Sequence, residues 1–161
     1  MSDDITRTLD EVFQAIVAGV GREARITIGP GEEGGIDVTL VGEDLDVLVG
    51  RDGSVIDALQ YLAHQIVLRQ GDGTVGRVSL DVDGYRERRR AQLVKLAEHA
   101  ASEAVTHGEE IELDAMTPHD RRIVHMALAE RTDVVTRSEG QEPRRRIVVE
   151  PAGDDGGGDG D

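Results

Sequence analysis

The chain has no cysteine and no tryptophan, and it contains one phenylalanine and two tyrosines. Without cysteine, neither a disulfide framework nor a thiolate metal site can form. No apolar run approaches the ~20 residues that a membrane-spanning helix needs, and the acidic start Met1–Asp4 lacks the basic residues of a signal peptide. We therefore expect a cytoplasmic protein without membrane insertion, with a core of Val, Ile, Leu and Ala.

Lysine is also scarce, since arginine outnumbers it 17 to 1. The formal net charge of −15 by itself argues against nucleic-acid binding. The charge is uneven, however: residues 1–50 carry 3 basic and 11 acidic side chains, whereas residues 51–100 carry 8 and 7. Arginine suits planar phosphate and base contacts, but a GC-rich genome is the simpler explanation of its abundance here.

Hydrophobic periodicity in the first half predicts the order helix–strand–strand–helix–helix–strand. The helices are expected over 4–20, 45–49 and 54–69, and the strands over 25–28, 36–40 and 78–82. In the third helix, Ser54 and Asp57 resemble a capping box. Tyr61 is a candidate core residue, and the expected inward face is Val55, Leu59, Leu62 and Ile66. The order matches a type II KH domain, which we assign to residues 1–83.

The second half predicts a small α+β domain over residues 84–150. A helix is expected over 85–106, with Leu93, Leu96, Ala97, Ala100, Ala104 and Val105 inward. A strand at 111–113, a helix beginning at Thr117-Pro118, and a hairpin over 134–149 follow. No linker separates the halves, so we expect two rigidly joined domains. Residues 151–161 are almost entirely Gly and Asp, and we expect a disordered tail.

The most informative motif is Gly50-Arg51-Asp52-Gly53, which lies between two predicted helices. Two glycines let the backbone approach a sugar-phosphate chain, and the helix beginning at Ser54 directs its N-terminal amides toward the turn. KH domains hold about four nucleotides of a single strand in this way. Arg51 adds positive charge, which Asp52 opposes. The alternative is a tight helix–helix turn that binds no ligand.

A second candidate pair is Arg121 and His125, which lie four residues apart on one helical edge. A guanidinium and a flat ring on the same edge suit a phosphate and a base. The alternative is a surface arginine beside a histidine bonded to the local backbone. Metal binding by His119, Asp120 and His125 is disfavoured because helical spacing separates the histidines. No nucleophile elbow or phosphate loop is present, so we expect no enzyme, cofactor or metal.

Three strings resemble the bacterial Jag family, also called KhpB or EloR: Leu48–Gly53 with Asp57–Leu62, Met116–His125, and Ser138–Arg146. The similarity covers about residues 5–150. It implies a type II KH domain followed by a domain named for an Arg-x-x-x-His pair. The RNA-binding residues that it implies are Gly50, Arg51, Asp52, Gly53, Ser54, Arg121 and His125. The composition suggests an actinobacterial member, and the chain is expected to lack the extra N-terminal domain of many members.

The resemblance also implies links to cell elongation and division, and pairing with a small single-KH protein. We therefore expect a single-stranded RNA-binding protein that acts as a post-transcriptional regulator. The alternative is a KH-fold interaction module that dimerises, with itself or with a KhpA-like partner, and binds RNA secondarily. The acidic first 50 residues favour this alternative because they would repel phosphate.

Overall fold

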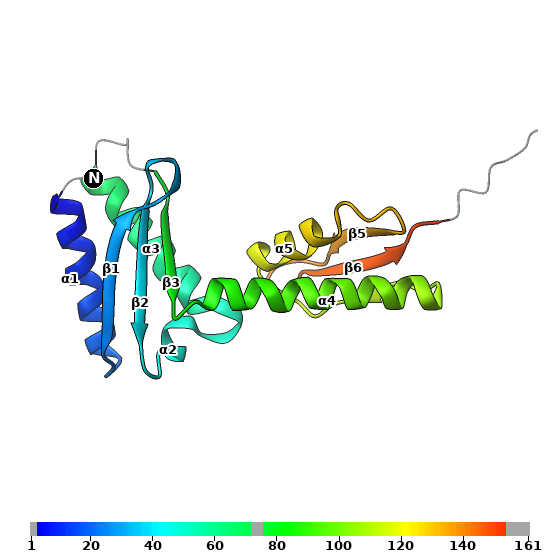
Figure 1. Ribbon diagram of the computed structural model, residues 1–161, viewed down its shortest axis with the longest axis horizontal. Helices are drawn as coiled ribbons and strands as arrows, with labels where there is room; N and C mark the ends of the chain where they lie inside the picture. Colours follow the sequence, from blue (N-terminus) through cyan, green and yellow to red (C-terminus); the bar gives the residue numbers. More distant parts are fainter. Residues whose placement is uncertain (1–2, 72–75, 154–161) are drawn as a thin grey trace, which may run out of the picture. The chain divides into compact units, whose positions relative to one another are not determined.

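The computed structural model describes residues 3–71 and 76–153. The chain divides into two compact units, Met1–Glu87 and Arg88–Asp161, and each is described by itself. The first unit has the element order that the periodicity predicts (Figure 1). Its elements are α1 (Asp3–Gly19), β1 (Ala24–Pro30), β2 (Ile36–Gly42), α2 (Asp46–Val49), α3 (Ser54–Gln70) and β3 (Val78–Val82), with 3-10 turns η1 (Glu32–Gly34) and η2 (Arg51–Gly53).

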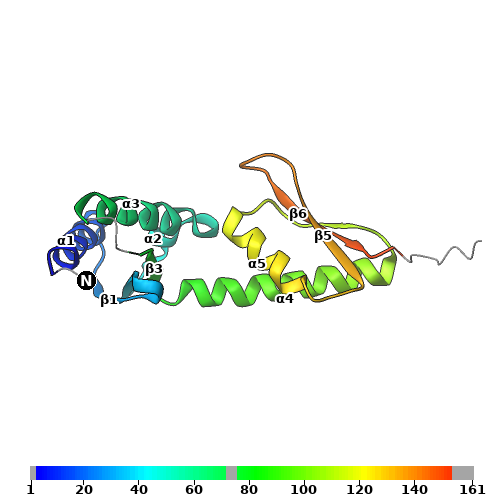
Figure 2. The same cartoon turned by 90° about the horizontal axis from the view of Figure 1, so that it is seen from above.

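Strand β2 is the centre of a three-stranded sheet, antiparallel to β1 and parallel to β3. Parallel strands need a long crossover, and α2 and α3 lie in this connection. Figure 2 shows α1 and α3 side by side on one face of the sheet. The alternating pattern of β2 accordingly buries Ile36, Val38 and Leu40 beneath Leu9 and Phe13 of α1 and their neighbours.

The face that α3 buries differs from the predicted one. Ile56, Ala63 and Val67 are buried, whereas Leu62 is 55% exposed and Tyr61, the candidate core residue, is 64% exposed. Apolar residues occur on every side of this helix, so periodicity alone could not select the packed face. The small side chain of Ala63 is the one that allows close packing.

The predicted capping box at the start of α3 is also wrong. The N-cap residue is Gly53, and no side chain bonds to the first turn. Ser54 is instead the first residue of the helix, and the Asp57 carboxylate accepts a hydrogen bond from Arg86 at 2.7 Å. A long-range ion pair has replaced the local cap.

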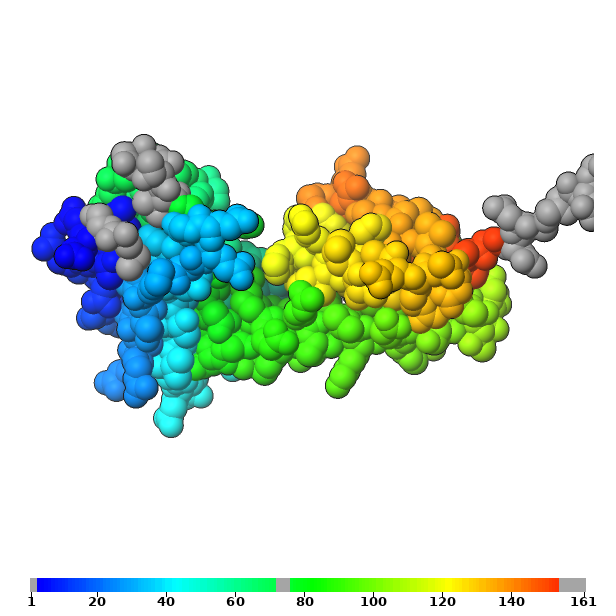
Figure 3. All heavy atoms as spheres, turned by 45° about the horizontal axis from the view of Figure 1, so that its top comes forward, coloured from blue at the N-terminus to red at the C-terminus, as the bar shows by residue number. Residues whose placement is uncertain are grey.

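The second unit is a three-stranded antiparallel sheet packed with two helices. Its elements are α4 (Tyr85–His107), which begins in the first unit, β4 (Ile111–Glu112), α5 (Pro118–Leu128), β5 (Val134–Glu139) and β6 (Arg146–Pro151). The sheet order is β4-β6-β5. Figure 3 shows α5, in yellow, lying directly against α4, in green. The α+β class and the predicted hairpin are confirmed.

Local signals explain the start of α5. Thr117 is the N-cap, its Oγ1 accepts a hydrogen bond from the Asp120 amide at 3.2 Å, and Pro118 follows at the first helical position, as predicted. Two inward predictions for α4 are wrong, since Leu96 and Val105 are exposed. Five residues of α4 are buried instead: Leu93, Ala97, Ala100, Ala101 and Ala104.

The C-terminal segment that the sequence predicts as a tail is described only in part. Strand β6 continues to Pro151, and the Ala152 amide donates to the Asp133 carbonyl at 2.8 Å. Residues 154–161 lie outside the described residues.

Candidate nucleic-acid interface

The Gly50–Gly53 turn joins α2 to α3 and has an unusual backbone. Gly50 has φ 73° and ψ −175°, Gly53 has φ 80° and ψ 14°, and Asp52 between them has φ 52°. L-residues rarely adopt these angles, whereas glycine does so without a steric penalty. The turn therefore needs glycine at both of its ends.

Both glycines are also closely covered where a side chain would stand. A Cβ on Gly50 would lie 2.4 Å from Val55 Cγ2, and a Cβ on Gly53 would lie 2.7 Å from the Tyr85 hydroxyl oxygen. Within the first unit, Tyr85 thus supports the inner side of the turn. This packing distinguishes the motif from a flexible glycine-rich loop.

The outer side of the turn faces solvent. Arg51, Asp52 and Ser54 are exposed, while Gly53 is buried. The Ser54 amide donates to the Arg51 carbonyl, and no side chain caps α3. The Arg51 guanidinium makes no hydrogen bond or ion pair within the described residues. The positive end of the α3 dipole and an unpaired guanidinium are therefore presented together.

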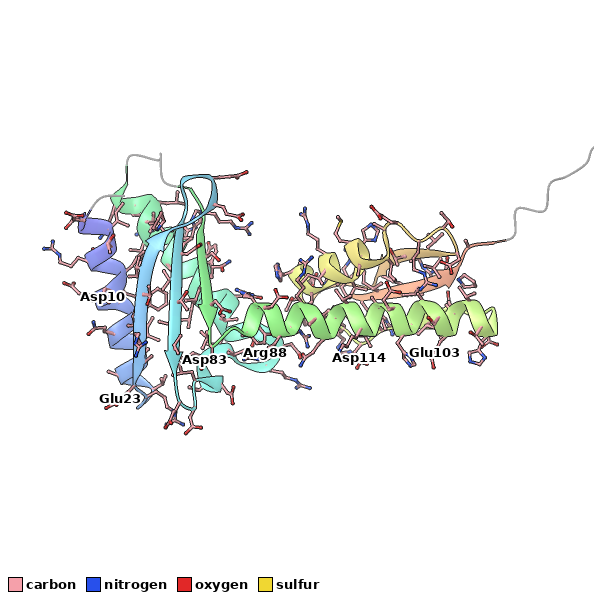
Figure 4. All side chains as sticks on the ribbon, in the orientation of Figure 1. Asp10, Glu23, Asp83, Arg88, Glu103 and Asp114 are labelled. Atoms are coloured by element: carbon pink, nitrogen blue, oxygen red, sulfur yellow. The ribbon has the colours of Figure 1, made fainter. Side chains whose placement is uncertain are left out.

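Arg86 fixes the position of α3 behind the turn. Its Nη1 donates to Asp57 Oδ1 at 2.7 Å, its Nη2 to Gln60 Oε1 at 3.3 Å, and its Nε to the Leu80 carbonyl at 3.2 Å. Gln60 Oε1 also accepts the Leu80 amide at 2.9 Å. Because these bonds join the first two turns of α3 to β3, the helix N-terminus has one position relative to the sheet. Figure 4 labels Asp83 just beyond β3, where its Oδ1 accepts the Gly42 amide.

His125 lies on the edge of α5 that faces β5. Its Nδ1 is 2.5 Å from Thr136 Oγ1, and the side chain is exposed. This contact holds the ring in one orientation, and Nε2 has no partner within the described residues. The ring can therefore stack on a base or donate to a phosphate.

Arg121 lies on the same edge, as its spacing from His125 predicts, but it is only 11% exposed. Its Nη1 donates to the Met116 carbonyl at 2.7 Å, and its Nη2 pairs with the Glu142 carboxylate. Arg121 therefore joins the segment before α5 to the hairpin loop. Neither alternative from the sequence is correct, because the arginine is not a surface residue and the histidine bonds a side chain rather than the local backbone.

Most other arginines of the second unit are neutralised by carboxylates. Arg137 donates to Glu110 at 3.0 Å, and this hydrogen bond is the main cause of its raised pKa. Arg131 pairs with Asp133 at 2.7 Å, which lowers the pKa of that carboxyl group. These paired guanidiniums attract phosphate less than the unpaired Arg51 does.

Four residues that shape the interface were not identified from the sequence: Tyr85, Arg86, Thr136 and Glu142. Glu142 lies inside the Ser138–Arg146 string that resembles the family, which is a weak signal for it. The other three act through contacts between distant segments, and their residue types carry no local pattern.

Within residues 3–71 and 76–153, no helix combines the length and apolarity that crossing a bilayer requires. The same part of the chain contains no cluster of three or more His, Asp or Glu side chains arranged to hold a metal ion.

Comparison with known proteins identifies the second unit first. Residues 91–151 match the family model of the domain named for its Arg-x-x-x-His pair, and the match covers most of α4 and everything from β4 to β6. The chain is 35% identical over 150 residues to the "RNA-binding protein KhpB" of Clostridium symbiosum, an alignment covering 92% of this chain and 65% of that protein. It is 36% identical over 151 residues to the protein of the same name from Lactiplantibacillus plantarum, covering 92% and 45%.

The chain therefore belongs to the KhpB family, also called Jag, and contains its Arg-x-x-x-His domain. A relative from Bacillus subtilis with the same name is 25% identical over 139 residues, covering 85% of this chain and 66% of that protein. The chain thus spans between about half and two thirds of the length of these relatives. Their shared name refers to RNA binding and not to a catalytic activity.

Proposed function

We propose that this chain binds single-stranded RNA, with the first unit acting as a type II KH domain. The observation that carries the proposal is the turn at Gly50–Gly53: a rigid backbone, an exposed outer side, and an uncapped α3 behind it. A sugar-phosphate backbone can lie against this turn because no Cβ projects from either glycine. Arg51 would contact a phosphate, and the α3 amides would stabilise its charge.

The Arg-x-x-x-His domain adds a second contact through His125. The Thr136 hydroxyl orients the ring, and Arg121 holds the segments around the base of α5 in place. Two weak contacts in one chain raise the effective concentration of the strand at each site. With few aromatic residues for stacking, we expect modest affinity, low sequence preference and marked salt dependence. We further propose the family role of a post-transcriptional regulator linked to cell elongation and division.

The test is a fluorescence anisotropy titration of several labelled single-stranded RNAs at low salt. Arg51→Asp should weaken binding by roughly tenfold or more, because it places repulsive charge beside the phosphate. The matched control is Arg25→Asp, since Arg25 is an exposed arginine of β1 in the same unit without a partner in the described residues. A flat titration, or equal affinities for the two variants, would contradict the proposal.

One observation favours a second function, that of a protein-interaction module. Helix α3 exposes three large apolar side chains on neighbouring turns, Tyr61, Leu62 and Leu68. An amphipathic stripe of this kind suits helix–helix pairing with another KH fold. Native mass spectrometry with and without RNA separates the functions: dimers that persist without RNA and are lost in Leu62→Lys support the interaction module.

A further inference from the structure

The far edge of α5 carries a feature that the Arg121–His125 pair does not explain. Each helical residue turns about 100° from the last, so His119, Ile123 and Ala127 lie on the edge opposite to His125. That edge faces α4 rather than β5. A hollow of about 340 Å³ lies there, lined by Arg90, Val94, His119, Arg122, Ile123, Met126 and Ala127.

The hollow differs in charge from the rest of the protein. Its lining contains two guanidiniums and one imidazole but no carboxylate, in a chain whose formal net charge is −15. Within the part of the chain that the structure describes, Arg90, Arg122 and His119 make no side-chain hydrogen bond or ion pair. Their neighbours do: Arg89 pairs with Asp120, and Arg121 with Glu142. Because carboxylates are plentiful, two unpaired arginines at one hollow indicate an anionic ligand.

The floor of the hollow specifies more than an anion. Val94, Ile123 and Ala127 are half-buried, and the Met126 side chain is 61% exposed at the rim. Methionine packs adaptably against flat ring systems through its polarizable sulfur. An apolar surface of this kind beside two guanidiniums fits a ligand with a phosphate at one end and a planar base at the other. The volume is at the lower end of small-molecule sites, which limits the occupant to about one nucleotide.

We propose that this hollow between α4 and α5 is a nucleotide subsite, with Arg90 and Arg122 on the phosphate and the apolar floor beneath the base. The subsite rests on the proposed function for the identity of its ligand, which is one nucleotide of the bound single strand. Arg122 lies three residues before His125 and on the outward side of α5. A strand that leaves His125 therefore crosses the helix at Arg122 before it reaches the hollow.

The test follows the backbone amides of the isotope-labelled full chain by NMR during titration with adenosine 5′-monophosphate, inorganic phosphate or adenosine. The monophosphate should shift amides of residues 119–127 and bind about tenfold more tightly than either fragment, since it alone uses both halves of the subsite. Arg90→Ala and Arg122→Ala should each weaken this binding severalfold. Lys95→Ala is the matched control, because Lys95 is an exposed cation of α4 outside the lining.

Equal binding of the monophosphate and inorganic phosphate would overturn the subsite, as would Arg90→Ala and Arg122→Ala variants that behave like Lys95→Ala. A titration with single-stranded RNA separates this result from the proposed function. Shifts at residues 50–54 with a silent hollow would leave RNA binding by the turn intact and overturn the subsite. Shifts at the hollow with a silent turn would support the subsite and contradict the role of the turn.

Discussion

Gly53 packs directly against Tyr85, so that a Cβ at this position would lie 2.7 Å from the tyrosine hydroxyl oxygen and 3.1 Å from Cε1. The contact joins the turn at the start of α3 to the residue that begins α4. The glycine is thus required twice, once for its positive φ and once for the space that Tyr85 fills.

The two requirements can be separated by alanine substitution. Gly34 has φ +76°, similar to the +80° of Gly53, but a Cβ there would meet nothing within 4 Å. Gly34→Ala should therefore cost only the backbone strain, about 1 kcal/mol, whereas Gly53→Ala should cost about 3 kcal/mol because overpacking is added. Urea unfolding measures both. Equal costs would show that Tyr85 moves aside freely.

The Asp120 carboxylate is expected to stabilise the second unit. Its side chain is 4% exposed, and Oδ2 accepts two hydrogen bonds from Arg89, at 3.0 and 2.7 Å. Asp120→Ala should lower the free energy of unfolding by about 3 kcal/mol, since it leaves a largely covered guanidinium without its partner. Asp114→Ala removes an exposed carboxylate of the same unit and should change stability by less than about 0.5 kcal/mol. Similar losses in the two variants would refute the prediction.

Glu142 should oppose RNA binding because its carboxylate neutralises Arg121 beside His125. We expect Glu142→Gln to tighten binding severalfold and to steepen the salt dependence by about one unit. The matched control is Glu139→Gln, which removes the same charge from a partner of Arg137. Anisotropy titrations at several salt concentrations compare the variants. If both variants tighten binding equally, the effect is one of net charge and not of Arg121.

The Arg131–Asp133 pair makes a prediction about acid. The hydrogen bond from Arg131 lowers the pKa of the Asp133 carboxyl in the folded state. A lowered folded-state pKa stabilises the fold above the unfolded-state pKa, and this stabilisation disappears as the pH falls through the folded-state value. NMR titration should show the Asp133 carboxyl protonating below its usual range in the wild type. Its midpoint should rise in Arg131→Ala, and an unchanged midpoint would contradict the assignment.

Local patterns predicted the elements of this fold because each depends on neighbouring residues. The alternation of Ile36, Val38 and Leu40 predicts β2, and Thr117-Pro118 predicts the start of α5. The Gly50–Gly53 turn is recognisable for the same reason, since its backbone requirement is written in two glycines.

What the sequence could not supply are partners that meet only in the folded chain. Asp57 reads as a local cap but bonds Arg86, which is 29 residues away. Arg121 reads as an exposed cation but is covered and paired with Glu142, 21 residues away. Such choices depend on which segments meet, and several nearby carboxylates would satisfy the same local pattern.

The account depends most on a nucleotide strand lying against the main chain at Gly50–Gly53. Amide chemical shifts of the labelled chain, recorded with a short single-stranded RNA at low salt, test this directly. The account predicts saturable shifts at Gly50–Ser54 and smaller shifts around His125 and Thr136. Saturable binding that leaves the amides of Gly50–Ser54 unshifted would contradict it.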